Sequence, residues 1–148
     1  MKKKVLVLAS AIVFLLSGCS LLNDAKDTLS YVNDATDYLN KATAFANDAP
    51  SIAQQAVSDQ QATAELKKML QEMKQEINTF NKLQAPEIAA DLHQQLVDQN
   101  NKLTAGIDLY LKNIQNGLLD PSILKNTEIF QSVQEISNIL DQIKQLGQ

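Results

Sequence analysis

The sequence predicts an all-α protein, an antiparallel four-helix bundle that follows a cleaved N-terminal signal peptide. Apolar residues recur at three- and four-residue spacing through most of the chain, which is the period of one helix face. No run of alternating β-branched and aromatic residues bounded by hairpin turns is found, so no strand is expected. Short breaks separate four segments of similar length, which favours antiparallel neighbours.

Composition narrows the classes of function. The 148-residue chain has 13 basic residues, all of them Lys, 17 acidic residues, one Cys and one His. Without Arg, bidentate guanidinium recognition of phosphate is excluded. A disulfide scaffold needs paired Cys, and a hydrophobic content of 45% exceeds that of most disordered chains. One folded domain is expected.

The N-terminus predicts a signal peptide over residues 1–18. Three Lys follow Met1, and Val5 to Leu16 form an apolar stretch too short to cross a hydrocarbon core of roughly 30 Å. Leu16, Ser17, Gly18 and Cys19 resemble the lipobox of bacterial lipoproteins at all four positions. The resemblance implies a diacylglyceryl group on the Cys19 sulfur and cleavage between Gly18 and Cys19. Two alternatives stay open: an uncleaved membrane helix and an ordinary free Cys.

Cleavage would leave a clearly acidic domain at residues 19–148. It has ten Lys against seventeen Asp and Glu, a formal charge of −7. Anionic lipid repels such a surface, so the acyl chains alone would hold it at the membrane. The basic stripe needed for nucleic-acid binding is absent. We expect a lipid-anchored protein on the extracytoplasmic face of the cell membrane, with no nucleic-acid partner.

The first predicted helix covers about residues 20–47. Its expected inward positions are Leu22, Ala25, Leu29, Val32, Leu39 and Ala46. Tyr31, Tyr38 and Phe45 follow at seven-residue intervals on the adjoining stripe. Pro50 is expected to end this helix and to open a short helix over residues 51–57, because proline suits a first helical turn and disrupts a helix interior.

The second and third helices are expected between Ser58 and Gly117. Ser58 with Gln61 resembles a capping box, and this second helix ends before Pro86. The third is predicted over residues 86–116, with Gly117 directly after its end. Its expected inward positions are Ile88, Leu92, Leu96, Leu103, Ile107, Tyr110 and Ile114.

The fourth helix is predicted to start at Asp120 and Pro121, a cap followed by a first-turn proline. Its second half has the most regular heptad spacing of the chain, at Ile129, Val133, Ile136, Leu140 and Ile143. Each of the four segments is expected to span about 25 to 31 residues, and therefore about 37 to 47 Å.

No catalytic or metal-ligating set is recognised. His93, with Glu87 and Asp91 nearby, lacks the spacing that places two ligands on one helix side, so a solvated or partly buried imidazole is expected. Carboxylates on the hydrophilic faces are expected to pair with Lys side chains such as Lys41 and Lys74. We expect no enzyme activity, no metal and no cofactor.

Two features could form a binding site. Tyr31, Tyr38 and Phe45 could line a groove for a hydrophobic ligand or a partner helix, or could widen the buried face, with the Tyr hydroxyls at a wet rim. The Gln99-Asn100-Asn101 stretch interrupts an apolar face. It predicts either a polar layer that fixes register or a looser place that accepts a ligand.

Several stretches look like a family of small lipoproteins of Bacillus and relatives. They are the lipobox and residues 31–39, 89–95 and 126–131. The resemblance spans nearly the whole chain and implies a membrane-anchored helical protein on the outer side of a Gram-positive cell. It implies no particular activity, and only Cys19 carries over as a functional residue. The leading hypothesis is a non-enzymatic bundle that binds or scaffolds another envelope protein. The alternative is a carrier of a small hydrophobic ligand or lipid.

Overall fold

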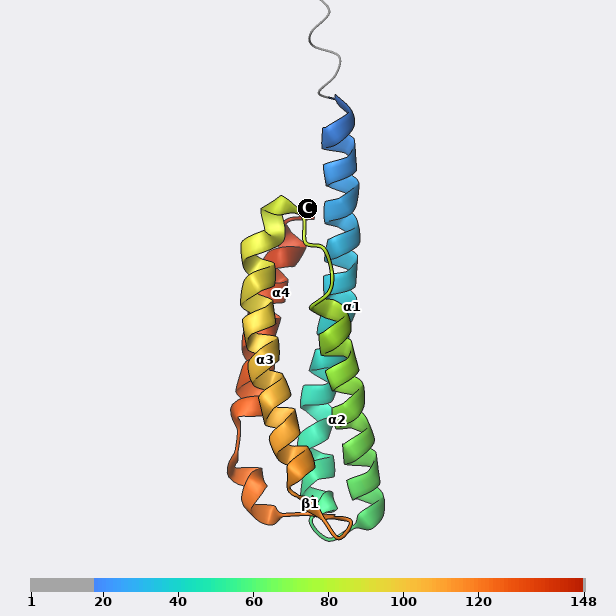
Figure 1. Cartoon of the computed structure of the whole chain (residues 1–148), viewed down its shortest axis with the longest axis vertical. Coiled ribbons are helices and arrows are strands. Elements are labelled where there is room, and N and C mark those ends of the chain that lie inside the picture. Colours follow the sequence, from blue (N-terminus) through green and yellow to red (C-terminus); the bar gives the residue numbers. More distant parts are fainter. Residues whose placement is uncertain (1–17, 148) are drawn as a thin grey trace, which may run out of the picture.

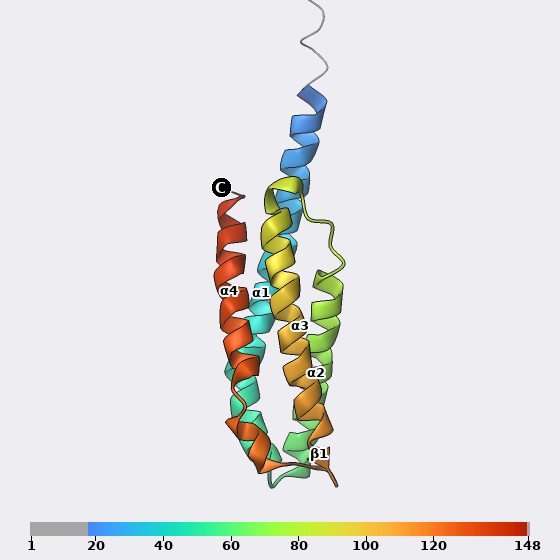
Figure 2. The same ribbon diagram turned by 60° about the vertical axis from the view of Figure 1, so that its left-hand side comes forward.

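The computed structural model describes the backbone of residues 18–147 and the side chains of residues 25–147. Within that range, the elements are α1 (Gly18–Ala56), α2 (Gln60–Phe80), the 3-10 helix η2 (Glu87–Ala89), α3 (Ala90–Lys112), β1 (Ile114–Gln115), β2 (Leu118–Leu119), the 3-10 helix η3 (Pro121–Lys125) and α4 (Glu128–Gln145). The four α-helices run side by side in alternating directions (Figures 1 and 2). The prediction of an all-α fold is confirmed.

The core is built on one stripe of α1. Large and small side chains alternate along this stripe at three- and four-residue spacing, in the order Tyr31, Ala35, Tyr38, Ala42, Phe45 and Ala49. Each is at most 4% exposed. The alanines allow α2 and α4, which both pack on α1, to approach closely, and the aromatic rings fill the space between them. The predicted heptad of α4 is buried at all five positions.

The predicted helix break at Pro50 is wrong, because α1 is one helix of 39 residues with Pro50 inside it. Proline has no N–H to donate to the carbonyl of Ala46, which destabilises a helix interior. However, Phe45, Ala49 and Ala53 are all buried, so the apolar spacing continues through Pro50. Core packing on both sides of Pro50 therefore keeps the helix continuous.

The helices do not have matched lengths. At 1.5 Å per residue, α1 is about 58 Å long and the other three are about 27 to 35 Å. The start of α1 therefore projects beyond the ends of its neighbours (Figure 1). Ala25 and Leu29, predicted to point inward, are exposed there, and burial on this stripe begins at Val32.

The turn between α1 and α2 is closed by side chains. The cap of α2 is Asp59 rather than the predicted Ser58, and its carboxylate accepts a hydrogen bond from the Gln61 backbone N–H at 2.7 Å. The buried Thr63 hydroxyl lies 2.9 Å from the carbonyl oxygens of both Ala56 and Asp59 and donates to them. The last carbonyl of α1, that of Ala56, thus finds a partner inside the bundle.

A two-stranded hairpin replaces the predicted end of α3. β1 pairs antiparallel with β2, so the expectation of no strand is wrong for these four residues. Asn116 and Gly117 connect them with φ angles of 54° and 78°. Such positive angles at both central residues match the right-handed twist of a hairpin and suit Asn-Gly. Gly117 therefore belongs to a turn, and α3 already ends at Lys112.

The predicted cap at Asp120 is confirmed, but it opens η3 instead of α4. The Asp120 carboxylate accepts a hydrogen bond from the Ser122 backbone N–H at 2.8 Å, and Pro121 occupies the first position of η3. Hydrogen bonds from Ser122 hold the pKa of Asp120 below its usual value. The helix α4 begins at Glu128, where the heptad spacing begins.

Candidate functional site

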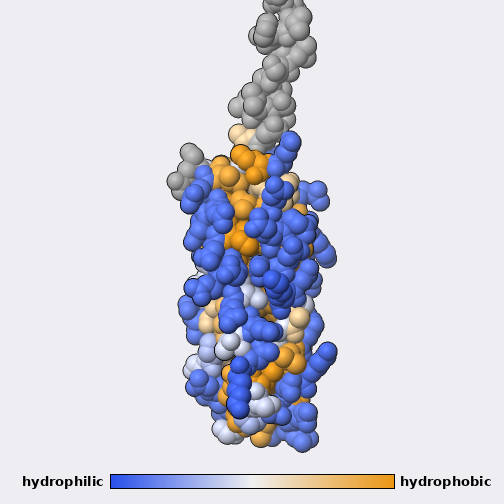
Figure 3. Space-filling view, turned by 90° about the vertical axis from the view of Figure 1, so that its left-hand side faces the viewer, coloured by the Kyte–Doolittle hydropathy of each residue, from blue (hydrophilic) through white to orange (hydrophobic). Residues whose placement is uncertain are grey.

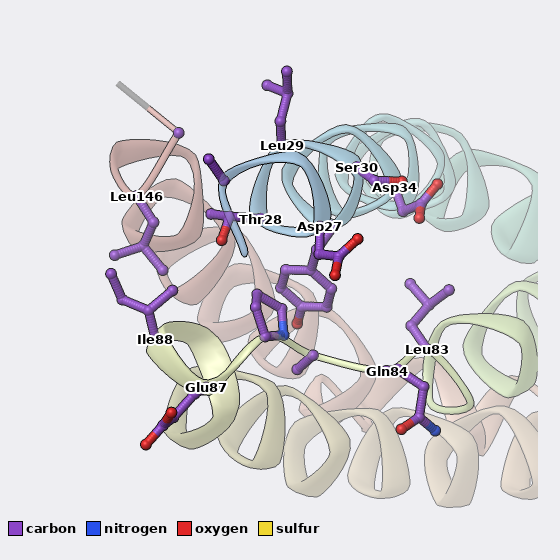
Figure 4. Close-up of a pocket in the computed structure, with 15 residues that line it drawn as sticks. Asp27, Thr28, Leu29, Ser30, Asp34, Leu83, Gln84, Glu87, Ile88 and Leu146 are labelled. Carbon is purple, nitrogen blue, oxygen red and sulfur yellow. The ribbon is translucent and has the colours of Figure 1, made fainter. Parts of the chain in front are cut away.

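An open groove lies at the end of the bundle from which α1 projects. It occupies about 1150 Å³ between residues 25–34 of α1, the connection from α2 to η2, and the C-terminal Leu146 and Gly147. Figure 4 shows Ile88 and Leu146 extending toward each other on one side, with Leu83 on the other. The irregular connection leaves this space open because no helix fills the gap beside the start of α1.

The groove carries exposed apolar side chains. Among the residues with described side chains, three large hydrophobic residues are exposed, and two of them, Leu29 at 54% and Ile88 at 64%, line the groove. Ile88 was predicted to point inward on α3, but it lies in η2, before α3 begins. Figure 3 shows apolar residues at the surface of this end of the molecule, and a second apolar area toward the opposite end. Monomeric proteins usually cover such patches unless they bind something.

A cluster of aromatic rings lies next to the groove, and one of them, Tyr31, lines it. The Tyr31 hydroxyl contacts His93 Nδ1 at 2.8 Å, which joins α1 to α3. The Phe80 ring lies 5.5 Å from His93 and 4.5 Å from Tyr38, measured between ring centroids. Burial raises the pKa of Tyr31. Burial also lowers the pKa of His93, although a hydrogen bond with the Asn81 backbone opposes this. Both groups are therefore mainly neutral near pH 7.

A polar layer lies next to these rings, farther inside the bundle. The buried Tyr38 hydroxyl donates to the side-chain oxygen of Asn100, and the Asn100 amide donates to the Asn81 side chain at 2.7 Å. Asn100 is fully buried. The middle residue of the Gln99-Asn100-Asn101 stretch thus forms the predicted polar layer, which ties α1, α3 and the end of α2 together. The Tyr hydroxyls, predicted at a wet rim, are bonded inside the protein instead.

The three predicted groove residues do not meet in one groove. Tyr31, Tyr38 and Phe45 are 3%, 3% and 4% exposed and widen the core. Tyr31 borders the large groove, and Tyr38 borders a second hollow of about 160 Å³ between α1 and α2. Phe45 lines neither. The residues that sequence reasoning missed are Leu83, Ile88 and Leu146, which become neighbours only through the fold.

The lipobox lies at the boundary of the described chain. Leu16 and Ser17 lie outside the described residues. Gly18 and Cys19 are the first two residues of α1. Among the helices of residues 18–147, none is long and apolar enough to cross a membrane.

Charged groups near the groove are mainly acidic. Asp27, Asp34 and Glu87 line it, and no Lys does so among the described side chains. Elsewhere the predicted pairing of Lys with carboxylates is found. Lys41 Nζ lies 2.7 Å from Glu76 and Lys74 Nζ lies 2.6 Å from Asp108. In the described part of the chain, no group of three or more His, Cys, Asp and Glu side chains is placed to hold a metal ion.

Comparison with known proteins gives a family and a full-length relative. The uncharacterized lipoprotein YybP of Bacillus subtilis (strain 168) is 30% identical over 148 residues, which is the whole of both chains. This relative supports a lipoprotein nature for the chain. No solved structure matches this chain significantly. The family of unknown function DUF6376 matches residues 31–146, from the first buried turn of α1 to the end of the bundle. The chain therefore belongs to the DUF6376 family.

Proposed function

We propose that this protein is a lipoprotein held at the outer face of the cell membrane by a diacylglyceryl group on Cys19. Residues 1–18 would be its signal peptide and residues 19–148 its mature domain. The bundle would bind or scaffold another protein of the cell envelope, without catalysing a reaction and without a cofactor.

The anchor is supported by two independent observations. The lipobox residues lie at the start of the helical domain, with Gly18 and Cys19 in α1, and the full-length relative is named a lipoprotein. The acidic mature domain has no polybasic segment that could serve as a second membrane signal. The acyl chains would therefore carry the attachment alone.

The groove is the observation that supports the proposal of partner binding. It lies at the end of the bundle where the chain continues toward Cys19, and it leaves Leu29 and Ile88 largely exposed. Exposed apolar side chains rimmed by polar groups mark protein interaction surfaces. Beside the groove, Tyr31 and His93 are hydrogen-bonded to each other. No carboxylate is bonded to this pair among the described side chains, so it lacks the third group that orients a catalytic base.

Replacement of the lipobox Cys tests the anchor. Cys19→Ser should accumulate an unprocessed precursor and lose acyl labelling, because the thioether requires the sulfur. Ser20→Ala, a change at the next residue, should be processed and labelled as the wild type. Normal processing of the Cys19→Ser protein would refute lipidation.

Site-specific crosslinking tests partner binding. A photoreactive residue at position 88 should give a defined adduct with one envelope protein in intact cells. The matched control is position 109, since Leu109 is the third exposed large hydrophobic residue at 37% and lies on α3 outside the groove. Recovery of the chain alone from both positions, or the same adducts from both, would contradict the proposal.

The volume of the groove also favours a second candidate, a carrier of a small hydrophobic ligand or lipid. About 1150 Å³ is enough for a drug-sized molecule, although the groove is open to solvent. Tyr31 would contact such a ligand, whereas Tyr38 and Phe45 would stay in the core. Mass spectrometry of the purified full-length protein would detect a bound lipid at near-stoichiometric amount. Its loss from an Ile88→Ser variant and its retention in Leu109→Ser would support a carrier.

A further inference from the structure

The lining of the groove combines apolar side chains with charges of one sign. Leu83, Ile88 and Leu146 supply apolar surface, and Asp27, Asp34 and Glu87 supply three carboxylates. Lys26 and Lys82 are close in sequence, but neither lines the groove. A partner that buries these apolar groups would therefore meet only negative charge.

The position of the groove suits a helix as its occupant. The start of α1 continues beyond α3 and α4, and its stripe through Ala25 and Leu29 keeps the spacing that reaches the core at Val32. This spacing is the one by which two helices pack side by side. On the other side, Ile88 and Leu146 extend toward each other and give this side of the groove an apolar lining (Figure 4).

The charge of the groove disfavours two other occupants. A second copy of the chain would place the same three carboxylates against an equally acidic surface, in a mature domain of formal charge −7. Anionic lipid headgroups would be repelled for the same reason. A helix carrying Lys or Arg gains from the same charges, because opposite charges across an interface speed association and reject wrong partners.

We propose that the groove binds an amphipathic helix of a partner protein, with apolar side chains on Ile88, Leu146 and Leu83 and with Lys or Arg side chains facing Asp27, Asp34 and Glu87. This inference rests on the proposed function of protein binding and names the chemistry of the partner. Arginine and lysine at the edges of the apolar stripe play the part that charged flanking positions play in a coiled coil.

Synthetic peptides test this chemistry directly. The full-length lipidated chain is placed in phosphatidylcholine nanodiscs, and empty discs measure background. Three fluorescent 18-residue helical peptides are compared by anisotropy: one with a Leu stripe and Lys flanks, one with Glu in place of Lys, and one with Ser in place of Leu. The Leu and Lys peptide should bind above background, and each of the other two should bind at least about tenfold more weakly.

Matched variants locate the binding to the groove. The triple variant Asp27→Asn, Asp34→Asn, Glu87→Gln should weaken binding of the Leu and Lys peptide about tenfold and should reduce its dependence on salt. The control changes Asp48→Asn, Glu65→Gln and Glu135→Gln, which remove the same charge from exposed positions outside the groove. Ile88→Ser should also weaken binding, while Leu109→Ser should not.

Several outcomes would overturn the inference. Equal binding of the Lys and Glu peptides, equal losses in the two triple variants, or no binding of any peptide would each contradict it. Groove variants that change only self-association would identify a second copy as the occupant. Variants that change only attachment to phosphatidylglycerol vesicles would identify the bilayer. A partner crosslinked at position 88 through a segment without Lys or Arg would refute this inference and leave the proposed function standing.

Discussion

The two ends of the bundle differ in how completely they are closed. At the end opposite the start of α1, the hairpin and η3 cover the helix ends, and Leu119 and Ile123 are 2% and 6% exposed. At the end from which α1 projects, Leu29 and Ile88 are 54% and 64% exposed beside an open groove. Both ends contain connections between antiparallel helices. The need to connect helices therefore does not by itself explain why one end has an open groove.

The difference predicts which end contributes most to stability and which end is available for the proposed binding. The closed end has side-chain caps at Asp59 and Asp120 and a buried hydroxyl at Thr63. The open end has an irregular connection that enters η2 at Pro86 without a side-chain cap. Regions with few buried apolar contacts open most readily and are where binding surfaces are found. Changes at the closed end should therefore reduce stability, and changes at the open end should affect binding.

Truncation of a closed-end side chain should give the largest effect. Leu119→Ala removes a side chain that is 2% exposed, so the free energy of unfolding should fall by about 3 kcal/mol. Urea unfolding of the full-length protein in detergent, followed by circular dichroism, measures it. Ile88→Ala at the open end should change the same quantity by less than about 0.5 kcal/mol. Similar losses at the two positions would mean that the two ends are equally packed.

The polar layer between the ends should rank next. Asn100→Ala leaves the Tyr38 hydroxyl and the Asn81 side chain without their buried partner, which should cost about 2 kcal/mol of unfolding free energy. Tyr38→Phe should cost less, since only one hydrogen bond is removed. In the double variant the two losses should not add, because both remove the same bond. Full additivity would show that the layer does not act as a unit.

Much of the bundle could be predicted from the sequence because its core obeys helical spacing. The five heptad positions of α4 and the cap at Asp120 were predicted and are found. The predicted break at Pro50 is wrong, because the local effect of proline is outweighed by the apolar spacing that continues through Ala49 and Ala53. Asn116-Gly117 is a typical sequence for a hairpin turn. The residues on either side lack the alternating pattern of strands, so no hairpin was expected there.

The candidate site could not be predicted in the same way. Tyr31 of the aromatic stripe borders the groove, but the groove itself depends on where three chain segments end. Ile88 is exposed because η2 precedes α3, and Leu146 reaches it from the far end of the sequence. The spacing of apolar residues along one helix contains no information on which segments of the chain come together in the fold. The lipobox stays a prediction, and it can be made from the sequence alone because its signal is entirely local.

The hairpin turn at the closed end should be sensitive in a specific way. Gly117 has a φ of 78°, and an added Cβ would also lie 3.4 Å from the Gln60 side chain. Gly117→Ala should therefore lower the free energy of unfolding by about 1 kcal/mol. Asn116→Gly, at a φ of 54°, should leave stability nearly unchanged because glycine adopts this angle freely. An equal loss in both variants would show that the turn geometry is not the cause.

The smallest effect concerns His93 beside the open groove. Burial lowers its pKa in the folded protein below the ordinary value of 6.5, so the unfolded chain takes up the proton first as pH falls. The contribution of His93 should be fully present above about pH 7 and should be lost as pH falls through 6.5 toward the folded pKa. The single imidazole makes the pKa measurable by NMR titration without assignment. His93→Gln should flatten stability between pH 7.5 and 6 relative to the wild type, and a folded pKa above 6.5 would reverse the expected sign.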